Sequence, residues 1–126
     1  MKCVYGDWDA YINIKSAVVG GKRQKDDISK ADGLKAFYAD DIDKQFFIAT
    51  FFIQFNANMS IEITKAIVFP IAWIPDIYVN PSNNGNLQSA YYKDLEDAVR
   101  RTNNQFVPLL HNAIRIAEKK KQERKK

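Results

Sequence analysis

The spacing of apolar residues near the N-terminus predicts a strand. Between residues 10 and 19, one side of the pattern is apolar at every second position except Ser16, while the other side is mixed. A two-residue period of this kind is typical of a strand that is buried on one face. Gly20 and Gly21 follow and predict its end, and the charged stretch 22–27 predicts a loop.

Two consecutive segments predict a hairpin. Residues 44–55 are rich in aromatic and β-branched side chains and are apolar on both faces, whereas residues 60–69 alternate, with Lys65 interrupting the more apolar face. Residues 56–58, Asn-Ala-Asn, predict the turn because asparagine tolerates a positive φ. A strand that is apolar on both faces needs cover on both sides, either from its own fold or from an oligomer partner.

Two further segments have a weaker pattern. Apolar residues spaced three apart over 28–39 predict a short helix with Ser29 as its cap. Pro70 and Pro75 bracket four apolar residues. Because proline cannot donate to a strand ladder, residues 71–79 are predicted to form an edge strand or an extended segment.

The pattern becomes helical in the C-terminal third. Residues 80–86 predict a loop that ends on Asn86 as a helix cap, and apolar residues from Leu87 to Ala117 then keep a three-to-four spacing. Pro108 interrupts this run. A proline removes a helical hydrogen bond, so the segment is predicted to form two helices or one kinked helix.

Together these elements predict an α+β fold, with a mostly antiparallel sheet of four to five strands covered by C-terminal helices. The length of 126 residues indicates one domain. Residues 1–114 are expected to form the globular part, including most of the C-terminal helices. Residues 115–126 are too highly charged to bury, so we expect a basic, frayed tail there.

Charge is unevenly distributed along the chain. The formal net charge is +4, from 19 basic and 15 acidic residues. Residues 115–126 hold seven of the basic residues and two of the acidic ones, which leaves 12 basic against 13 acidic residues in the remainder. The body is therefore close to neutral, and electrostatic attraction to an acidic partner is expected mainly at one end.

Few residues suit catalysis or metal binding. The single cysteine and the single histidine exclude an internal disulfide and a zinc site that needs several such ligands. The acidic residues at 7–9 and 40–43 lack the spacing of a calcium loop. Glu62 and Lys65 lack the order and spacing of a nuclease metal site. The sequence therefore predicts no catalytic residue, no metal ligand, no cofactor and no enzymatic activity. An enzyme with an unfamiliar set of residues is the alternative, and it would require Asp7, Asp9, Asp76 or Glu62 to converge in one pocket.

The expected compartment is the cytoplasm. The first residues form no apolar run of signal-peptide length, and the most apolar stretch, 46–55, is half the length that a membrane-spanning helix needs. The basic end lacks the large apolar face with Trp or Phe that binds a membrane surface. Abundant Asn, Lys and Ile are typical of an AT-rich coding sequence, such as that of a low-GC bacterium or its phage.

The sequence predicts a small protein-binding module that self-associates, acting as an assembly component or an inhibitor. The prediction follows from the lack of a catalytic set, from the strand that is apolar on both faces and from the segment 71–79, whose pattern indicates exposure. The expected partner is another protein or a second copy. The predicted contacts are Phe46, Phe52, Trp73, Ile74 and Tyr78.

The alternative is a nucleic-acid-binding protein that contacts phosphates with its basic tail. The predicted contacts in that case are Lys119, Lys120, Lys121, Arg124, Lys125, Lys126, Arg100 and Arg101.

Overall fold

The computed structural model describes residues 2–5, 8–21, 25–82 and 85–124, with side chains from Ala10 onward. Within these ranges the fold is α+β and ends in a long helix, as the sequence predicts. The strands are β1 (Lys2–Tyr5), β2 (Trp8–Val18), β3 (Asp26–Lys30), β4 (Gln45–Phe55), β5 (Ile61–Pro70), β6 (Tyr78–Val79) and β7 (Asn86–Ser89). The helices are α1 (Ala31–Asp40) and α2 (Asn103–Arg124), with short 3-10 turns η1 (Ile71–Trp73) and η2 (Leu95–Asp97).

The prediction of one sheet is wrong, because the described strands divide between two sheets. The larger sheet has four strands in the order β1-β2-β4-β5, and the smaller has three in the order β3-β7-β6. β2 and β4 are parallel, while the other described pairs are antiparallel. A parallel pair needs a crossover connection, which β3 and α1 supply here. α2 packs on α1, β6 and η1, so it covers the smaller sheet more than the larger one.

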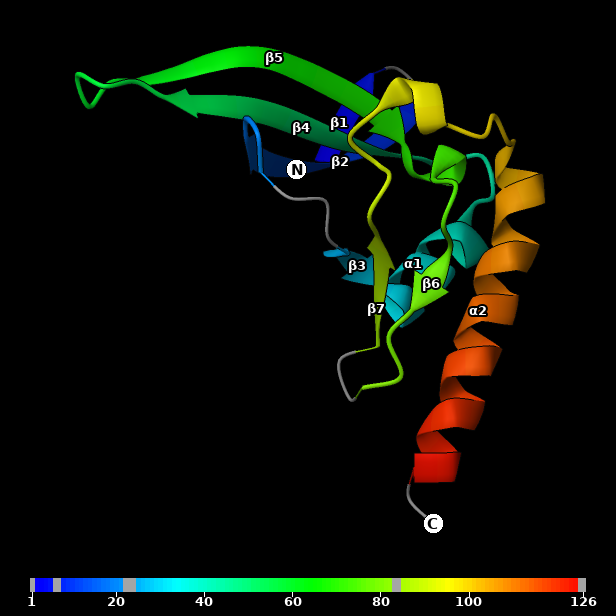
Figure 1. The fold of residues 1–126 in the computed structure, drawn as a ribbon. Coiled ribbons are helices and arrows are strands. Elements are labelled where there is room, and N and C mark those ends of the chain that lie inside the picture. The colour runs from blue at the N-terminus through cyan, green and yellow to red at the C-terminus, as the bar shows by residue number, and fades with distance from the viewer. Residues whose placement is uncertain (1, 6–7, 22–24, 83–84, 125–126) are drawn as a thin grey trace.

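The hairpin prediction is confirmed. β4 and β5 pair in antiparallel register from Phe47 opposite Pro70 to Phe55 opposite Ile61. The turn closes with the Asn56 amide donating to the Ser60 carbonyl at 2.9 Å. The hairpin extends well past the rest of the molecule as an arm (Figure 1).

The helix predicted over 28–39 begins later than expected. Residues 26–30 form β3, and the helix starts at Ala31 with Lys30 in the capping position and no side-chain cap. Ser29 therefore lies in a strand, where it pairs with Leu87 of β7. The extended segment predicted over 71–79 also differs, since it begins with the η1 turn and only its last two residues form a strand.

The helix predicted to start at Leu87 is wrong up to residue 102. Asn86 begins β7 rather than capping a helix, and Leu87 is buried between β3 and β6. Leu95 and Val99, which a helix would have turned toward the core, are exposed. Pairing with distant strands outweighs the local three-to-four spacing here.

α2 is continuous across Pro108, so of the two predicted alternatives the division into two helices is wrong. The helix starts at Asn103, and the carbonyl deprived of its bond by Pro108 is that of Asn104, in the first turn and exposed. Thr102 and Gln105 form a capping box: the Gln105 amide donates to the Thr102 hydroxyl at 3.2 Å, and the Thr102 amide to the Gln105 side chain at 2.9 Å. The helix continues to Arg124, where the sequence predicts fraying.

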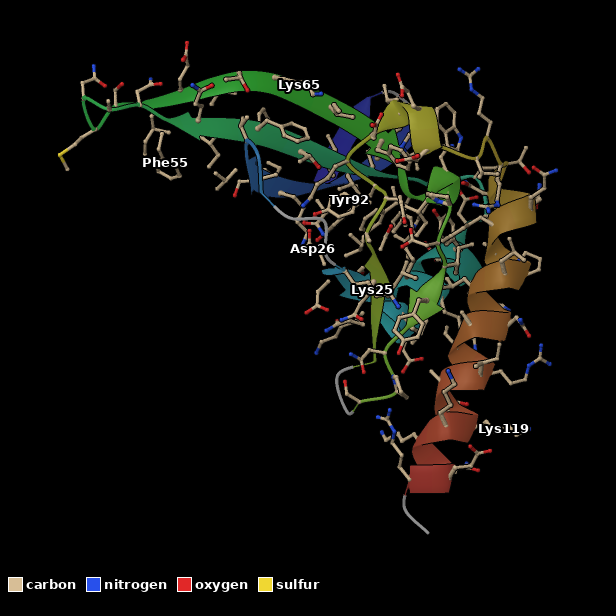
Figure 2. All side chains as sticks on the ribbon, in the orientation of Figure 1. Lys25, Asp26, Phe55, Lys65, Tyr92 and Lys119 are labelled. Atoms are coloured by element: carbon tan, nitrogen blue, oxygen red, sulfur yellow. The ribbon has the colours of Figure 1, made fainter. Side chains whose placement is uncertain are left out.

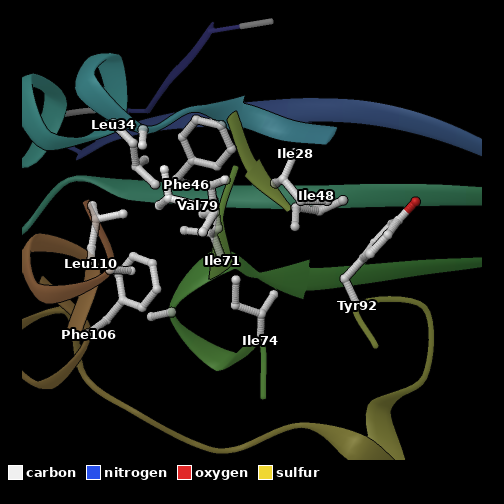
Figure 3. Close-up of a cluster of buried hydrophobic side chains, with 14 of the residues drawn as sticks. Ile28, Leu34, Phe46, Ile48, Ile71, Ile74, Val79, Tyr92, Phe106 and Leu110 are labelled. Atoms are coloured by element: carbon white, nitrogen blue, oxygen red, sulfur yellow. The ribbon is translucent and has the colours of Figure 1, made fainter. Parts of the chain in front are cut away.

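The core lies where both helices meet one end of the larger sheet (Figure 3). Phe106 and Leu110 of α2 pack there with Leu34 of α1 and with Ile48 and Phe69 of the hairpin strands. All five side chains are nearly or fully buried. Burial of this size stabilises a domain by roughly 2 kcal/mol for each large apolar side chain. The hairpin is therefore anchored at its base and projects freely from it.

Candidate functional site

An irregularity in the β4–β5 ladder decides which side chains share a face. The register pairs Phe52 with Lys65 but Ile53 with Ile63, so Thr64 is an extra residue in β5. An extra residue of this kind is a β-bulge, and it reverses the alternation of faces beyond it. Ile63 and Lys65, which a regular strand would place on the same face, therefore lie on opposite faces.

The face that bears Ile63, here called the outer face, is apolar across β2, β4 and β5. The register places no charged residue of these strands on it, and its polar members are Ser16 and Gln45. Six large apolar side chains on this face are between 50% and 65% exposed: Ile14, Val18, Phe55, Ile61, Ile63 and Val68. Four others on the same face are partly buried: Ile12, Phe47, Phe51 and Ile53.

The opposite, inner face of the sheet is the one that the fold uses. Phe46, Ile48 and Phe69 belong to it by the same register, and all three lie in the core cluster. Both helices lie on one side of the larger sheet (Figure 1), and their main contacts are with each other, with the smaller sheet and with η1. Within the described residues, the outer face is therefore a sheet surface that no helix covers.

The inner face overhangs an open hollow of about 700 Å³ between the arm and the segment that follows β7. Its charged lining carries both signs, with Lys65, Lys93, Asp26 and Asp97 among the lining residues. The Lys93 ammonium lies 3.0 Å from the Asp26 carboxylate, so part of this charge is paired within the fold.

Tyr92 forms one border of this region and connects it to the core. Its ring is buried in the cluster and its hydroxyl points away from it (Figure 3), donating to the Asp26 carboxylate at 2.6 Å. Asp26 and Tyr92 lie together below the arm in Figure 2. Burial, followed by this hydrogen bond and the negative charge of Asp26, raises the pKa of Tyr92 above its usual range. The contact holds the segment after β7 to the start of β3.

Two of the five predicted partner contacts are corrected by the structure. Phe46 and Ile74 are buried in the core, so their side chains offer no surface to a partner. Phe52, Trp73 and Tyr78 are partly buried. Arg100 lies over the ring of Trp73, 5.4 Å from its centroid, and the Lys25 ammonium lies 3.9 Å from that of Tyr78. The Lys65 ammonium lies 4.9 Å from the centroid of Phe52, so cations of the same chain lie beside all three rings.

The predicted nucleic-acid contacts are spread over two regions. Arg101 is corrected, because its Nη1 atom donates to the carbonyl oxygens of Ala72 at 3.3 Å and Ile74 at 2.6 Å, which is a structural role. The predicted contacts on α2 that the structure describes lie on the last turns of that helix. Lys121 is partly buried, and the others are exposed: Lys119, Lys120 and Arg124. Arg100 is exposed beside Trp73, and Lys125 and Lys126 lie outside the described residues.

Metal-ligating side chains do not gather in the described part of the chain, which holds no group of three or more His, Cys, Asp or Glu suited to an ion. Asp76 instead accepts hydrogen bonds from the Ser89 hydroxyl and, at 2.7 Å, from the Ala90 amide. Asp40 forms an ion pair with Lys44, and Asp7 lies outside the described residues. Neither described helix has the length and apolarity to cross a membrane.

The exposed residues of the outer face were not among the predicted contacts. Alternation alone places Lys65 on the same face as Ile61 and Ile63, and so predicts a charged interruption there. The bulge at Thr64 removes that interruption, and no sequence signal marks its position. No model of a known protein family matches this chain, and no curated protein matches it in sequence.

Proposed function

We propose that this protein is a cytoplasmic, non-enzymatic protein-binding module that self-associates, as an assembly component or as an inhibitor of a larger partner. The observation that supports it is the outer face of β2, β4 and β5, which no helix in the described part of the chain covers. Sheets normally bury at least one face and expose polar residues on the other. Here the exposed face is the apolar one, and a contiguous apolar surface of this kind marks an interaction site.

The arm adds to this surface. Beyond Ile53, β4 and β5 project past β2, and Phe55, Met59 and Ile61 are more than half exposed at the far end. Phe55 lies far out on the arm in Figure 2, remote from the core. Apolar side chains at this distance add nothing to the core, so their stabilising partner is expected in another molecule.

The test is molecular mass by light scattering over a range of protein concentrations. The unmodified chain is expected to self-associate, and the double variant Ile63→Thr/Val68→Thr, which keeps β-branched residues but removes apolar surface, is expected to remain monomeric. Ile116→Gln is the matched control, because Ile116 is also an exposed apolar residue but lies on α2. A monomer at every concentration, with no binding partner recovered, would contradict the proposal.

A second candidate function is nucleic-acid binding by the end of α2. What favours it is a convergence of cations around one aromatic ring: Lys25 and Lys120 lie 3.9 Å and 6.0 Å from the centroid of Tyr78. Lys119, on the adjoining surface of α2, lies at the far end of the molecule from Phe55 (Figure 2). Two like charges beside one ring are stabilised when an anion such as a phosphate neutralises them.

A salt series separates this candidate from the first. Binding of an oligonucleotide is measured for the unmodified chain and for a variant with Lys119, Lys120 and Arg124 changed to Gln. If the end of α2 binds phosphates, the slope of log K against log salt should flatten by about 0.7–0.9 for each phosphate that the variant no longer neutralises. Lys35→Gln, a change on α1, is the control. An unchanged slope would exclude the end of α2 as the site.

A further inference from the structure

We propose that the outer face is covered by a second copy of this chain, packed sheet against sheet as a two-layer β-sandwich with twofold symmetry. This deepens the function proposed above and rests on it, because it names both the partner and the geometry of self-association. The alternative within the same function is pairing of two β5 edges into one continuous sheet.

The size of the outer face fits such an interface. Ile14, Val18, Phe55, Ile61, Ile63 and Val68 are each half or more exposed. Single soluble domains rarely expose a contiguous apolar patch larger than roughly 300–600 Å², and larger patches mark interaction sites. A stable interface buries about 800 Å² on each partner. The partly buried side chains between them on β4, Phe51 and Ile53, belong to the same face and add to this surface.

The chemistry of the face selects its partner. The register places no charged side chain of β2, β4 or β5 on it. A charged ligand packed there would lose its hydration without gaining an opposite charge, which is unfavourable. The partner must therefore present a flat, uncharged, apolar surface. A second outer face has this chemistry, and in a twofold dimer the same patch meets itself. Sheets packed in this way interdigitate at a separation of about 10 Å.

The bulge at Thr64 also argues against edge pairing. β5 is an edge of the described sheet, and its middle carries both the bulge and the neighbouring Lys65. A bulge breaks the regular spacing of edge amides and carbonyls, and an edge lysine opposes strand addition. Thr64 therefore has two effects: its bulge places Lys65 away from the outer face, and it opposes the pairing of another strand with the β5 edge. Face-to-face packing is the arrangement compatible with both effects.

The experiment compares the solvent accessibility of the two faces as the chain associates. In a background with Cys3 changed to Ser, one variant carries Ser16→Cys, on the outer face of β2. The matched control carries Gln54→Cys, on the inner face of β4 and exposed. The rate of alkylation by a small maleimide is followed from dilute to concentrated protein. Light scattering gives the dimer fraction of the same samples, and circular dichroism confirms that both variants fold.

The expected result is a decrease in Ser16→Cys labelling that follows the dimer fraction, with Gln54→Cys labelled at the same rate throughout. A dimer in which Ser16→Cys keeps its monomer rate overturns the sandwich but leaves self-association standing. Equal protection of both cysteines also overturns it. A chain that stays monomeric at every concentration overturns both the sandwich and the proposed self-association.

A second measurement does not depend on cysteine variants. Amide hydrogen exchange of β5 is compared below and above the association concentration in the unmodified chain. In the sandwich, the edge amides of Thr64 to Val68 keep their exchange rates when the dimer forms. Strong new protection along this edge would show edge-to-edge pairing instead.

Discussion

Lys65 lies directly opposite Phe52 in the β4–β5 ladder, with its ammonium nitrogen 4.9 Å from the centroid of that ring. The pair belongs to the inner face, so the aromatic ring there is shielded by a cation. Phe55, on the outer face three residues along the same strand, is left exposed. The two faces of β4 therefore differ in how their aromatic rings are covered: a cation lies over Phe52, whereas Phe55 is exposed to solvent.

We expect this contact to be weakly stabilising. A cation over an aromatic ring at a partly exposed site contributes about 0.5 kcal/mol. A double-mutant cycle with Phe52→Leu and Lys65→Met, followed by urea unfolding, should give a coupling energy of that size. A coupling energy near zero would mean that the ammonium group stays in solvent, away from the ring.

Insertion of one alanine between Phe52 and Ile53 tests the role of the bulge, because the new residue pairs with Thr64 and makes the ladder regular. Phe69 is buried, so both strands are expected to keep their faces at that end, while Ile61 and Ile63 turn inward and Glu62 turns outward. A carboxylate on the outer face should weaken self-association by about 1.4 kcal/mol or more, which is tenfold in the dissociation constant.

Thr64→Ser, which keeps the bulge, is the control for this insertion and should associate normally. Sedimentation equilibrium measures both variants. If the insertion variant folds and associates as tightly as the unmodified chain, the bulge has no part in forming the surface.

Arg100 and Arg101 are neighbours with different predicted effects on stability. Arg101 donates to two backbone carbonyls of the segment around η1, so Arg101→Met should cost about 2 kcal/mol, as expected for hydrogen bonds that involve a charged group. Arg100→Met removes only a contact over the exposed side of Trp73 and should cost about 0.5 kcal/mol. Urea unfolding of the two variants measures this difference, and equal costs would contradict the assigned roles.

Stability should fall at alkaline pH because of two buried tyrosines. Burial raises the pKa of Tyr38, and burial together with Asp26 raises that of Tyr92. An unfolded tyrosine ionises at a pKa of about 10, whereas these two remain protonated in the folded chain. The unfolded state therefore binds fewer protons above that pH, and the free energy of unfolding decreases as pH rises further.

Urea midpoints measured on either side of pH 10 check this effect. Tyr38→Phe should flatten the alkaline decline and raise stability at neutral pH, because the Tyr38 hydroxyl is buried with no hydrogen-bond partner among the described residues. Tyr92→Phe should flatten the decline but lower neutral stability by about 1–2 kcal/mol, since Asp26 loses a donor. Tyr91→Phe, at an exposed tyrosine, is the control and should leave the decline unchanged.

Sequence patterns predicted the elements whose signals are local. The β4–β5 hairpin combines β-branched and aromatic runs with a turn, and it folds as predicted. The region around Leu87 was mispredicted because a short strand buried by distant partners carries the same spacing as a helix. Pro108 does not divide α2, because the cost of a proline depends on its distance from the start of the helix, and the Thr102–Gln105 capping box fixes that start.

The candidate surface was harder to predict than the fold. The two apolar faces of β4 predict an exposed apolar surface, but the pattern does not distinguish its residues from Phe46 and Ile74, which are buried in the core. Which apolar side chains face outward depends on strand register, and a single inserted residue at Thr64 changes that register.

The pairing of β2 with β4 ends at Val18 and Ile53, and beyond that point the arm is a ribbon of two strands. An isolated two-stranded ribbon is only marginally stable in water. The far end of the arm is therefore where backbone hydrogen exchange should begin, well before the core opens. An incoming subunit would find this region the least ordered and would rigidify it most.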